Sequence, residues 1–577
     1  MILFLLKLSI CAFSPFLVAE TIPKPAIRVR MNHGIFEQAS NIVAGLVEYE
    51  TPRIRIPSTQ QCFAEGCVQI HSFRVTSFRQ PSLVSLAPYP PNQMLLRVQD
   101  LDFFVTGSLG GSINVILTFP VSGTVYTSGR SISISAYLDL QKSVDDRPYL
   151  RFLSCQIDGG TIDTRVANMG LFTDTINTKY RGQMTSQTRQ LLQEAICANI
   201  HRLTQQHFSD RMEKFPTSVS AKTLVEMMLK PSSKSGEARF KRSMPEMTKQ
   251  RNTPNDDSGK SAGMQDDERK QRDADQEEEQ ARAVRLSSDE VSRFFNYNRL
   301  KHLFVDANLL DAAASYDDYS VGMSGNVFST KDQSPNPFLP PFPYRLPRSS
   351  RERMLEIGIA QYTLNSMLWH AHRTNSLLFH VDSKTPKIGA LLKTTCTLDE
   401  VCLSDQIEEV GQKFPDRQLE LIIRTTQPPN ITISKEKAIM TMEGRTLFFL
   451  EGTREKVGVL PFAAKILVKI NSHGSTVKGS LKIEDFRFLK GVDFFGLKVE
   501  DLEGFKNSIK GTMENMVNKA LDAGISLSTE DLNLPLRLSS PIISLEDGIL
   551  MLQANLDLYS TLYQDTPFQS FFFKYRH

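Results

Sequence analysis

The chain has 577 residues, and at roughly 150 residues per domain this length allows two to four domains. Its 67 basic and 64 acidic side chains give a formal net charge of +3, which argues against a strongly cationic nucleic-acid binder. A hydrophobic content of 40% and a mean hydropathy of -0.25 exclude a polytopic membrane protein.

Residues 1–19, MILFLLKLSICAFSPFLVA, form a short apolar run with a single lysine, Lys7. The run is too short for a stable membrane span, so it predicts a signal peptide that is cleaved near Ala19. An uncleaved N-terminal anchor is the alternative. No later stretch approaches about 18 apolar residues, so we expect the mature protein to be soluble, secreted and extracellular.

The first element after this segment is an amphipathic helix in HGIFEQASNIVAGLVEYE, because its apolar residues recur at spacings of three and four. Two loops follow, STQQCFAEGCVQI and TGSLGGSINVILTFPVSG. Within the second loop, NVILTFPV is apolar enough to enter a membrane interface, but a buried strand is the interpretation we favour. Ile132, Ile134 and Leu138 then alternate with polar or smaller residues, as in an antiparallel sheet with one buried face.

A second long helix is expected in QMTSQTRQLLQEAICANIHRLTQQHF. Residues 231–290 then form a mixed-charge segment with almost no apolar side chains. Such a segment cannot bury enough surface to offset its ordering entropy, so we expect a disordered insertion. A single charged helix is the alternative. Within it, Arg239, Lys241 and Arg242 have the spacing of a multibasic processing site, although an ordinary solvated charge run explains them equally well.

Residues 335–347, PNPFLPPFPYRLP, favour an extended polyproline linker. We therefore divide the mature chain into an N-terminal module over 22–334, which contains the insertion, and a C-terminal module over 348–577. The second module repeats the order of the first. It opens with a helix in IGIAQYTLNSMLWHAH, and its Gly358-Ile359 is spaced from Asn365 as Gly34-Ile35 is from Asn41.

Alternating strands follow around Leu419–Ile423 and Val477–Ile483, and a long helix is expected in EDLEGFKNSIKGTMENMVNKALDAG. One face of this last helix is apolar, with Leu502, Phe505, Ile509, Met513, Met516 and Ala520. The order of helix, strands, helix and strand, given twice, predicts an α+β fold built from a duplicated module.

Six cysteines remain once Cys11 is removed with the signal peptide, and six cysteines allow 15 pairings. Sequence proximity favours Cys62–Cys67 and Cys396–Cys402, which leaves Cys155–Cys197. Closing that last loop of about 43 residues stabilises the fold by roughly 4 kcal/mol in the chain-entropy model. A zinc site is the weaker alternative, because the spacings lack partner ligands. Asn430 begins an Asn-Ile-Thr sequon for N-glycosylation.

Taken in order, several of these features resemble the family of bactericidal/permeability-increasing protein, lipopolysaccharide-binding protein and cholesteryl ester transfer protein. They are the opening PAIRVRMNHGIFEQA, the Cys155–Cys197 pair, the proline-rich linker, the second opening MLEIGIAQYTLN, and PDRQLELIIRTTQPPNITIS. The resemblance implies an elongated boomerang of two modules, each a twisted, barrel-like antiparallel sheet packed on long helices, joined by a central sheet. It also implies one apolar pocket per module that holds a phospholipid-like molecule.

The expected function is therefore that of a secreted lipid-binding protein, with lipid transfer as an extension. Its partners would be a phospholipid or another lipid and, transiently, a membrane or lipid-particle surface. No cofactor is expected apart from bound phospholipid, and no nucleic acid. Each buried methylene contributes about 0.8 kcal/mol in a pocket and nearly as much in a bilayer, so extraction is close to balanced. The candidate lining residues, for each of which ordinary core packing is the alternative, are Ile35, Ala39, Ile42, Val43, Leu46, Ile359 and Leu368.

Lipopolysaccharide binding, with a role in innate immunity, is the alternative function. A multiply phosphorylated glycolipid needs dense basic charge. The loops STQQCFAEGCVQI and TGSLGGSINVILTFPVSG contain no Lys or Arg, and this argues for a general lipid carrier. A secreted lipase is less favoured, because the chain contains no Gly-x-Ser-x-Gly nucleophile elbow. We therefore expect no enzyme, and a structural or signalling protein is the remaining class.

Overall fold

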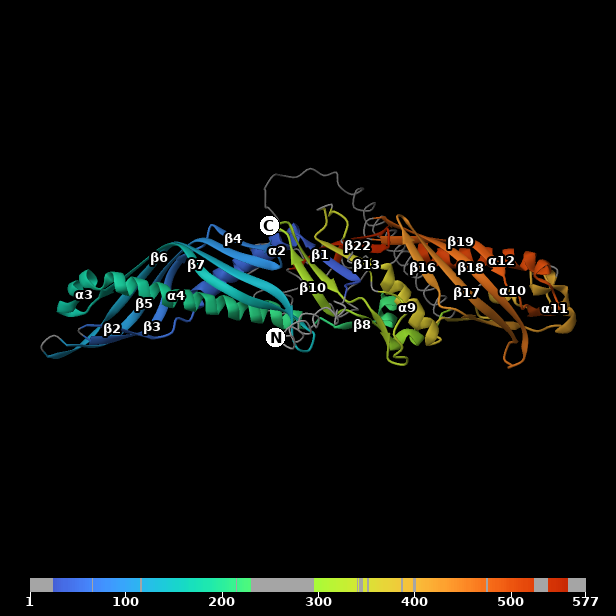
Figure 1. Cartoon of the computed structure of the whole chain (residues 1–577), viewed down its shortest axis with the longest axis horizontal. Helices are drawn as coiled ribbons and strands as arrows, with labels where there is room; N and C mark the ends of the chain where they lie inside the picture. Colours follow the sequence, from blue (N-terminus) through green and yellow to red (C-terminus); the bar gives the residue numbers. More distant parts are fainter. Residues whose placement is uncertain are drawn as a thin grey trace, which may run out of the picture.

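The computed structural model is elongated, with one module at each end and a sheet between them (Figure 1). The α+β class and the curled antiparallel sheets expected from the sequence are confirmed. The structure describes residues 24–64, 66–114, 117–213, 215–229, 295–339, 341, 346–349, 352–385, 388–397, 401–473, 476–522 and 538–558. The predicted signal peptide, the insertion 231–290 with Arg239, Lys241 and Arg242, and part of the proline-rich linker lie outside these residues.

The N-terminal module is built on one long antiparallel sheet in the order β2-β3-β5-β6-β7, with β4 paired to β5. Buried and exposed residues alternate along its central strands, so one face is apolar and turned inward. The 25 residues of β6 span roughly 80 Å at the usual rise per residue. The strands are β2 (Thr59–Phe63), β3 (Gly66–Arg79), β4 (Leu83–Tyr89), β5 (Gln93–Asn114), β6 (Thr118–Lys142) and β7 (Pro148–Ala167).

Two long helices pack on this sheet, α2 (His33–Glu50) and α4 (Arg181–Thr204). The Cys155–Cys197 disulfide ties α4 to β7, so it links helix and sheet across a sequence separation of 42 residues. The shorter elements are η1 (Thr51–Arg53), η2 (Gly170–Phe172), α3 (Thr173–Lys179), the π-helical turn η3 (Gln205–Ser209) and α5 (Asp210–Met212).

A six-stranded central sheet joins the two modules, in the order β10-β11-β1-β13-β22-β21. Strand β1 pairs with β11 on one side and with β13 on the other, so strands from both ends of the chain share one hydrogen-bonded sheet. These strands are β1 (Ile27–Asn32), β10 (Leu309–Ala314), β11 (Asp318–Met323), β13 (Leu355–Ala360), β21 (Leu538–Glu546) and β22 (Ile549–Leu556).

A buried ion pair lies at the middle of this central sheet. Arg30 on β1 stands opposite Glu356 on β13, at 2.8 Å, and the side chains are 13% and 1% exposed. Arg30 also donates to the backbone carbonyls of Leu346 and Pro347, and Ser349 donates to Glu356. The pair therefore holds together both modules and the segment that connects them.

Tyr319 on β11 is fully buried where the central sheet meets the N-terminal module. Its hydroxyl donates to the Asn92 carbonyl at 3.0 Å and accepts from the Leu140 amide at 3.3 Å. Burial raises the pKa of Tyr319 from the usual 10.0 to about 12, because the phenolate is disfavoured away from water.

The raised Tyr319 pKa predicts a loss of stability at high pH. The neutral phenol stabilises the fold fully below pH 10, and this contribution disappears as pH rises from 10 towards 12. We expect the free energy of unfolding to fall over that range by roughly 2 to 3 kcal/mol more in the wild type than in Tyr319→Phe. Urea unfolding of both proteins at several pH values measures the difference, and parallel pH profiles would contradict it.

A small three-stranded sheet, β12-β9-β8, packs against α9 (Gln361–Arg373) and shares a buried cluster with the central sheet. Its strands are β8 (Ser218–Ser220), β9 (Leu303–Asp306) and β12 (Val327–Ser329), and α6 (Ala221–Leu229) and η4 (Tyr297–His302) pack beside it. The N-terminal part of the chain thus reaches the base of the C-terminal module.

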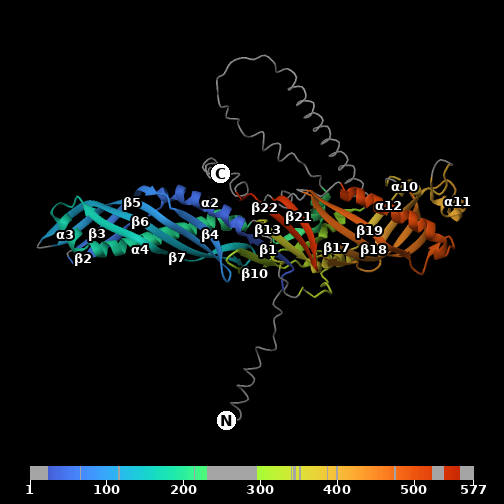
Figure 2. The same cartoon turned by 90° about the horizontal axis from the view of Figure 1, so that it is seen from above.

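The C-terminal module has its own antiparallel sheet, β14-β15-β17-β18-β19, with β16 paired to β17 and β20 paired to β18. Helix α12 runs along this sheet as α4 does along the first (Figure 2). The strands are β14 (Leu378–Val381), β15 (Leu419–Thr425), β16 (Asn430–Ser434), β17 (Lys437–Leu450), β18 (Lys456–His473), β19 (Thr476–Phe488) and β20 (Asp493–Phe494). The helices are α10 (Ile388–Leu391), η5 (Leu403–Asp405), α11 (Glu408–Lys413), η6 (Val499–Leu502) and α12 (Glu503–Asp522).

Both modules hold a helix against an edge strand in the same way. In the C-terminal module, Asn518 on α12 bonds the amide and the carbonyl of Leu481 on β19, at 2.6 and 2.8 Å. In the N-terminal module, Asn177 on α3 bonds both backbone groups of Val166 on β7, at 2.9 and 2.8 Å. An edge strand leaves such groups unpaired, so the asparagines satisfy them and attach the helices at the edge.

Two local expectations were wrong. The second module opens with a strand, so Ile359 lies in β13, and α9 begins four residues later than the Gly-Ile alignment places it. Over its described residues the segment NVILTFPV is not a buried strand either, since Asn114 and residues 117–120 are exposed and Val121 alone is buried. It is the end of the β5–β6 hairpin, with Leu117 69% and Phe119 42% exposed. Local periodicity did not reveal which apolar residues lie at a turn.

Candidate lipid-binding cavity

The C-terminal module encloses a cavity of about 250 Å³ between α12, the sheet and the α10–η5 segment. None of the described residues that line it is charged, and the polar ones are limited to Gln406, Thr446, Ser508 and Thr512. The apolar lining comprises Phe379, Val381, Ile388, Leu391, Leu392, Val401, Cys402, Leu403, Leu421, Ile423, Met440, Met442, Phe448, Leu460, Phe462, Ala464, Ile466, Leu481, Ile483, Phe486, Phe488, Phe505, Ile509, Met513 and Val517.

Strand periodicity places the sheet side chains in the cavity. Leu421 and Ile423 are two apart on β15, and they lie opposite Phe448 and Thr446 of β17. Side chains of alternate residues share one face of a strand, so Leu460, Phe462, Ala464 and Ile466 of β18 form the next inward row. The alternating pattern that predicts a half-buried sheet therefore also provides the wall of the cavity.

Helix α12 closes the cavity on its other side. Phe505, Ile509 and Met513 recur every four residues and line the cavity from one helix face. The neighbouring face holds Glu514 and Asn518, which accept from the amides of Ile483 and Leu481 on β19. The helix is thus attached through its polar side chains, and its apolar face is left for the cavity.

An empty apolar cavity of this size is costly. At about 24 cal/mol per Å³, a void of about 250 Å³ destabilises a fold by roughly 6 kcal/mol, which is comparable to the total stability of many domains. Water gains little in such a space, because it needs polar partners for its hydrogen bonds. The arrangement therefore favours an apolar guest in the cavity.

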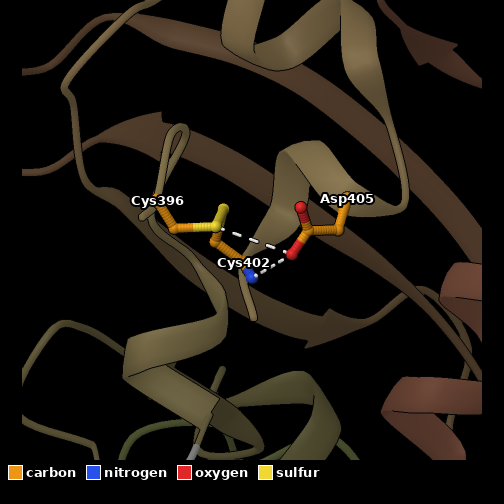
Figure 3. Close-up of side chains that lie close together, drawn as sticks. All are labelled: Cys396, Cys402 and Asp405. Atoms are coloured by element: carbon orange, nitrogen blue, oxygen red, sulfur yellow. Dashed lines mark hydrogen bonds between the residues drawn. A yellow bond between two sulfur atoms is a disulfide. The ribbon is translucent and has the colours of Figure 1, made fainter. Parts of the chain in front are cut away.

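A disulfide joins two of the segments that line the cavity. Cys396 and Cys402 are joined, and Val401, Cys402 and Leu403 line the cavity, with Val401 63% exposed at its rim. Asp405 accepts from the Cys402 amide at 2.9 Å and lies 3.5 Å from the Cys396 sulfur (Figure 3). The bond fixes the segment after α10 to η5, and both segments contribute lining residues.

The same three residues could suggest a metal site, because their ligand atoms lie within 4.8 Å of one another. Both sulfurs are consumed in the disulfide, however. Neither is the thiolate that a metal such as zinc requires. The arrangement therefore stabilises the loop.

Opening this disulfide should loosen this part of the cavity lining without unfolding the module. We expect Cys396→Ser/Cys402→Ser to lower the free energy of unfolding by about 2 kcal/mol, since the closed loop is short, and to speed the release of a bound fluorescent fatty acid several-fold. Stopped-flow displacement measures the release. The matched control is Cys62→Ser/Cys67→Ser, which opens a similarly short loop in the other module and should leave release unchanged. Equal release from all three proteins would contradict a role of this disulfide in retaining the bound fatty acid.

The N-terminal module contains a smaller cavity of about 60 Å³ between α2, α4, η3 and the sheet. Of the residues expected to contact lipid, Val43 and Leu46 line it, whereas Ile35, Ala39 and Ile42 are buried elsewhere along α2. Ile35 packs against Leu355 and Leu556 of the central sheet. The full lining is Val43, Leu46, Val47, Leu86, Met94, Leu96, Leu138, Leu150, Ile200, Leu203, Thr204 and Phe208.

The two lining residues expected in the second half lie outside both cavities. Ile359 is on β13 and packs beside Ile27 and Val327, and Leu368 is half-buried on α9. The lining that the sequence interpretation missed is the apolar face of α12. Its four-residue spacing is a signal that the sequence contains, whereas the likeness between the two opening helices points to α9 instead.

The structure can be compared directly with the predicted disulfides and with the predicted glycosylation site. The structure joins Cys62–Cys67 and Cys396–Cys402, the pairs that sequence proximity favours, and Cys155–Cys197, the pair that these two leave. Asn430 begins β16 and is exposed, as a glycan acceptor must be. In the part of the chain that the structure describes, no helix is both long and apolar enough to span a bilayer.

Comparison with known proteins matches the C-terminal part of the chain to a protein family. Residues 297–558 match the model of the LBP / BPI / CETP family, C-terminal domain. Three solved structures are similar. A lipopolysaccharide binding protein has 16% identity over 92% of this chain and 99% of that one, with a TM-score of 0.45. P47 of Clostridium botulinum E1 has 9% identity over 92% of this chain and 99% of that one, with a TM-score of 0.27. Takeout 1 of Epiphyas postvittana has 12% identity over 30% of this chain and 90% of that one, with a TM-score of 0.22.

Proposed function

Residues 297–558 make the chain a member of the LBP / BPI / CETP family, and we propose from this premise that it is a secreted lipid carrier that holds an acyl lipid in its C-terminal cavity. Family membership supports lipid binding. The observation that carries the specific proposal is the cavity of about 250 Å³ with no charged residue among its described lining. Such a lining accommodates hydrocarbon chains and leaves a charged headgroup outside.

The proposed cargo is a phospholipid, with its chains inside and its headgroup at the rim. Gln406, Ser508 and Thr512 are the polar lining residues that come from η5, α12 and the turn beside them. They can hydrogen-bond to the ester region of a lipid without contributing charge. Because a bilayer and an apolar cavity stabilise a methylene to a similar extent, loading and release need no energy source. Carriage of lipid, rather than catalysis, is the proposed role.

The two modules are proposed to bind unequal amounts of lipid. The apolar cavity between α2 and α4 of the N-terminal module, about 60 Å³, is about a quarter the size of the C-terminal one. A wider hollow of about 710 Å³ on the same module is lined by charged residues such as Arg79, Asp102 and Arg165. The smaller apolar cavity has room for a small apolar group, whereas a whole acyl chain fits the C-terminal cavity better. We therefore expect about one lipid per molecule, held in the C-terminal module.

Uptake from vesicles tests the proposal. The purified secreted protein is mixed with vesicles of radiolabelled phosphatidylcholine, separated by gel filtration, and then offered unlabelled acceptor vesicles. We expect about one labelled lipid per protein, and its appearance in the acceptors. Uptake without delivery would indicate sequestration, and would contradict a carrier. A parallel incubation with lipid A asks whether a phosphorylated glycolipid competes. Complete displacement of phosphatidylcholine by lipid A would overturn the proposed cargo.

A further inference from the structure

Three methionine side chains line the C-terminal cavity, Met440 and Met442 on β17 and Met513 on α12. The two on β17 are two residues apart, so they share the inward face of the strand. They lie opposite Ile466 and Ala464 of β18, which also line the cavity. Thioether groups therefore border the cavity from both the sheet and the helix. These three residues are called the cavity methionines below.

The cavity methionines are not enclosed in the core. Each is half-buried and packs at the edge of the buried cluster that contains Phe448. A methionine side chain has three rotatable bonds and a polarisable sulfur, so it adapts to the shape of a guest. Because the three side chains border the space proposed for an acyl chain, their sulfur lone pairs are accessible to a reactive group on that chain.

A hydroxyl group interrupts the apolar wall of the sheet. Thr446 on β17 lies opposite Ile423 of β15 and Leu460 of β18, and all three line the cavity. A polar group on a guest is penalised in apolar surroundings unless it finds a hydrogen-bond partner. The hydroxyls of Thr446 and of Ser508 on α12 can provide one. The cavity can therefore hold an acyl chain that carries a small oxygen-containing group along its length.

The inference that follows rests on the proposed carriage of an acyl lipid. Unsaturated acyl chains react with oxygen and acquire hydroperoxide groups, which are small, polar and oxidising. We propose that the C-terminal cavity also takes lipid hydroperoxides, and that the cavity methionines reduce them to the corresponding alcohols. The protein then removes oxidised groups from its cargo in addition to carrying it.

The reaction involves only the thioether and the hydroperoxide. The sulfur lone pair attacks the terminal oxygen, so that a sulfur–oxygen bond forms and the oxygen–oxygen bond breaks. The proton of the terminal oxygen passes to the oxygen left on the chain. The sulfur loses two electrons and becomes a sulfoxide, and the hydroperoxide gains them and becomes an alcohol. Each methionine reacts once, so one protein molecule reduces at most three hydroperoxides.

Confinement favours the cavity methionines over the others in the chain. One guest in a space of about 250 Å³ has an effective concentration on the order of 1 to 10 M, far above that of a dilute lipid in solution. The chain contains 19 methionines. If the guest is the oxidant, the three that line the cavity should react before the rest.

A phosphatidylcholine with one linoleate hydroperoxide chain tests the proposal. The purified secreted protein is loaded with this lipid, free lipid is removed by gel filtration, and peptide mass spectrometry follows oxidation of each methionine. We expect the cavity methionines to gain oxygen at least about tenfold faster than Met31, Met212 and Met323, which are partly buried outside the cavity. One lipid alcohol should appear for each sulfoxide. Equal oxidation of the two sets would overturn the proposal.

Matched variants identify the reductant. We expect Met440→Leu/Met442→Leu/Met513→Leu, which conserves side-chain volume, to reduce bound hydroperoxide at least about tenfold more slowly. The rate is expressed per bound hydroperoxide, so a change in lipid retention does not affect it. The control, Met31→Leu/Met212→Leu/Met323→Leu, should reduce it at the rate of the wild type. An unaffected cavity variant would overturn the proposal.

Two further measurements separate the possible causes of failure. Aqueous hydrogen peroxide should show no preference for the cavity methionines, and an equal preference would show that intrinsic reactivity, rather than the bound guest, sets the rate. Intact phosphatidylcholine is loaded in parallel. A wild type that retains neither lipid would contradict the proposed function itself. A wild type that retains both lipids but leaves the hydroperoxide unreduced would contradict only the present inference.

Discussion

The double substitution Ile509→Trp/Met513→Trp should abolish lipid retention while the protein remains folded. Both side chains line the C-terminal cavity from one face of α12, and two indoles there would occupy space proposed for an acyl chain. Overpacking a filled core destabilises it, but filling a void recovers contacts that the void has lost. We expect at least about a tenfold loss of bound lipid by mass spectrometry, with the unfolding midpoint in urea unchanged or raised.

The control for this prediction is Asn507→Trp. Asn507 lies on the same helix but is exposed and does not line the cavity, so it should retain the lipid content of the wild type. Normal lipid content in the double variant would show that lipid is bound outside the C-terminal cavity. A double variant that fails to fold would show instead that the space is occupied by protein.

The substitution Arg30→Met should destabilise the protein by about 3 to 5 kcal/mol. It would leave Glu356, whose side chain is 1% exposed, without its cation in the middle of the central sheet. It would also remove the bonds to the Leu346 and Pro347 carbonyls. Because the pair spans β1 and β13, both modules should lose stability together, and the urea midpoint monitors this loss.

A double-mutant cycle on Arg30 and Glu356 separates the effect of the buried charge from the effect of side-chain packing. An uncompensated carboxylate is the main cost, so Arg30→Met/Glu356→Met should recover most of the lost stability. The exposed pair Arg79–Asp102, with Arg79 68% exposed, is the comparison, and Arg79→Met should change stability by less than about 1 kcal/mol. If the double variant were as unstable as Arg30→Met alone, the buried charge would not be the cause.

Much of the fold follows from local patterns in the sequence. The apolar spacing in α2 and α12 and the alternation in β6, β15 and β19 are local signals, and the structure contains the corresponding elements. The boundary between β13 and α9 at Ala360 is harder to predict from the sequence. In LEIGIA the strand and helix patterns overlap, and only pairing with β1 and β22 makes this segment a strand.

The cavity could be predicted only in part. The apolar face of α12 was visible, but its opposing wall on β15, β17 and β18 depends on long-range strand register. Whether apolar residues meet as a filled core or around a void depends on volumes that periodicity does not encode. For the same reason the unequal cavities of the two modules could not be foreseen, and Val43 and Leu46 line the smaller one.

The exposed end of the β5–β6 hairpin illustrates the opposite difficulty. Apolar residues are usually assigned to the core, and NVILTFPV invites that assignment. Asn114 instead pairs with Thr118 across the β5–β6 hairpin, and Leu117 at its end is 69% exposed. Turn position, rather than hydrophobicity, decides whether such a segment is buried.

The central claim, that the C-terminal cavity carries lipid, is tested most directly by native mass spectrometry of the secreted protein purified without detergent. The account predicts a species heavier than the protein by about one phospholipid, which organic extraction removes and identifies, and predicts its loss in Ile509→Trp/Met513→Trp. A wild-type protein that shows only its own mass, with nothing in the extract, would contradict it.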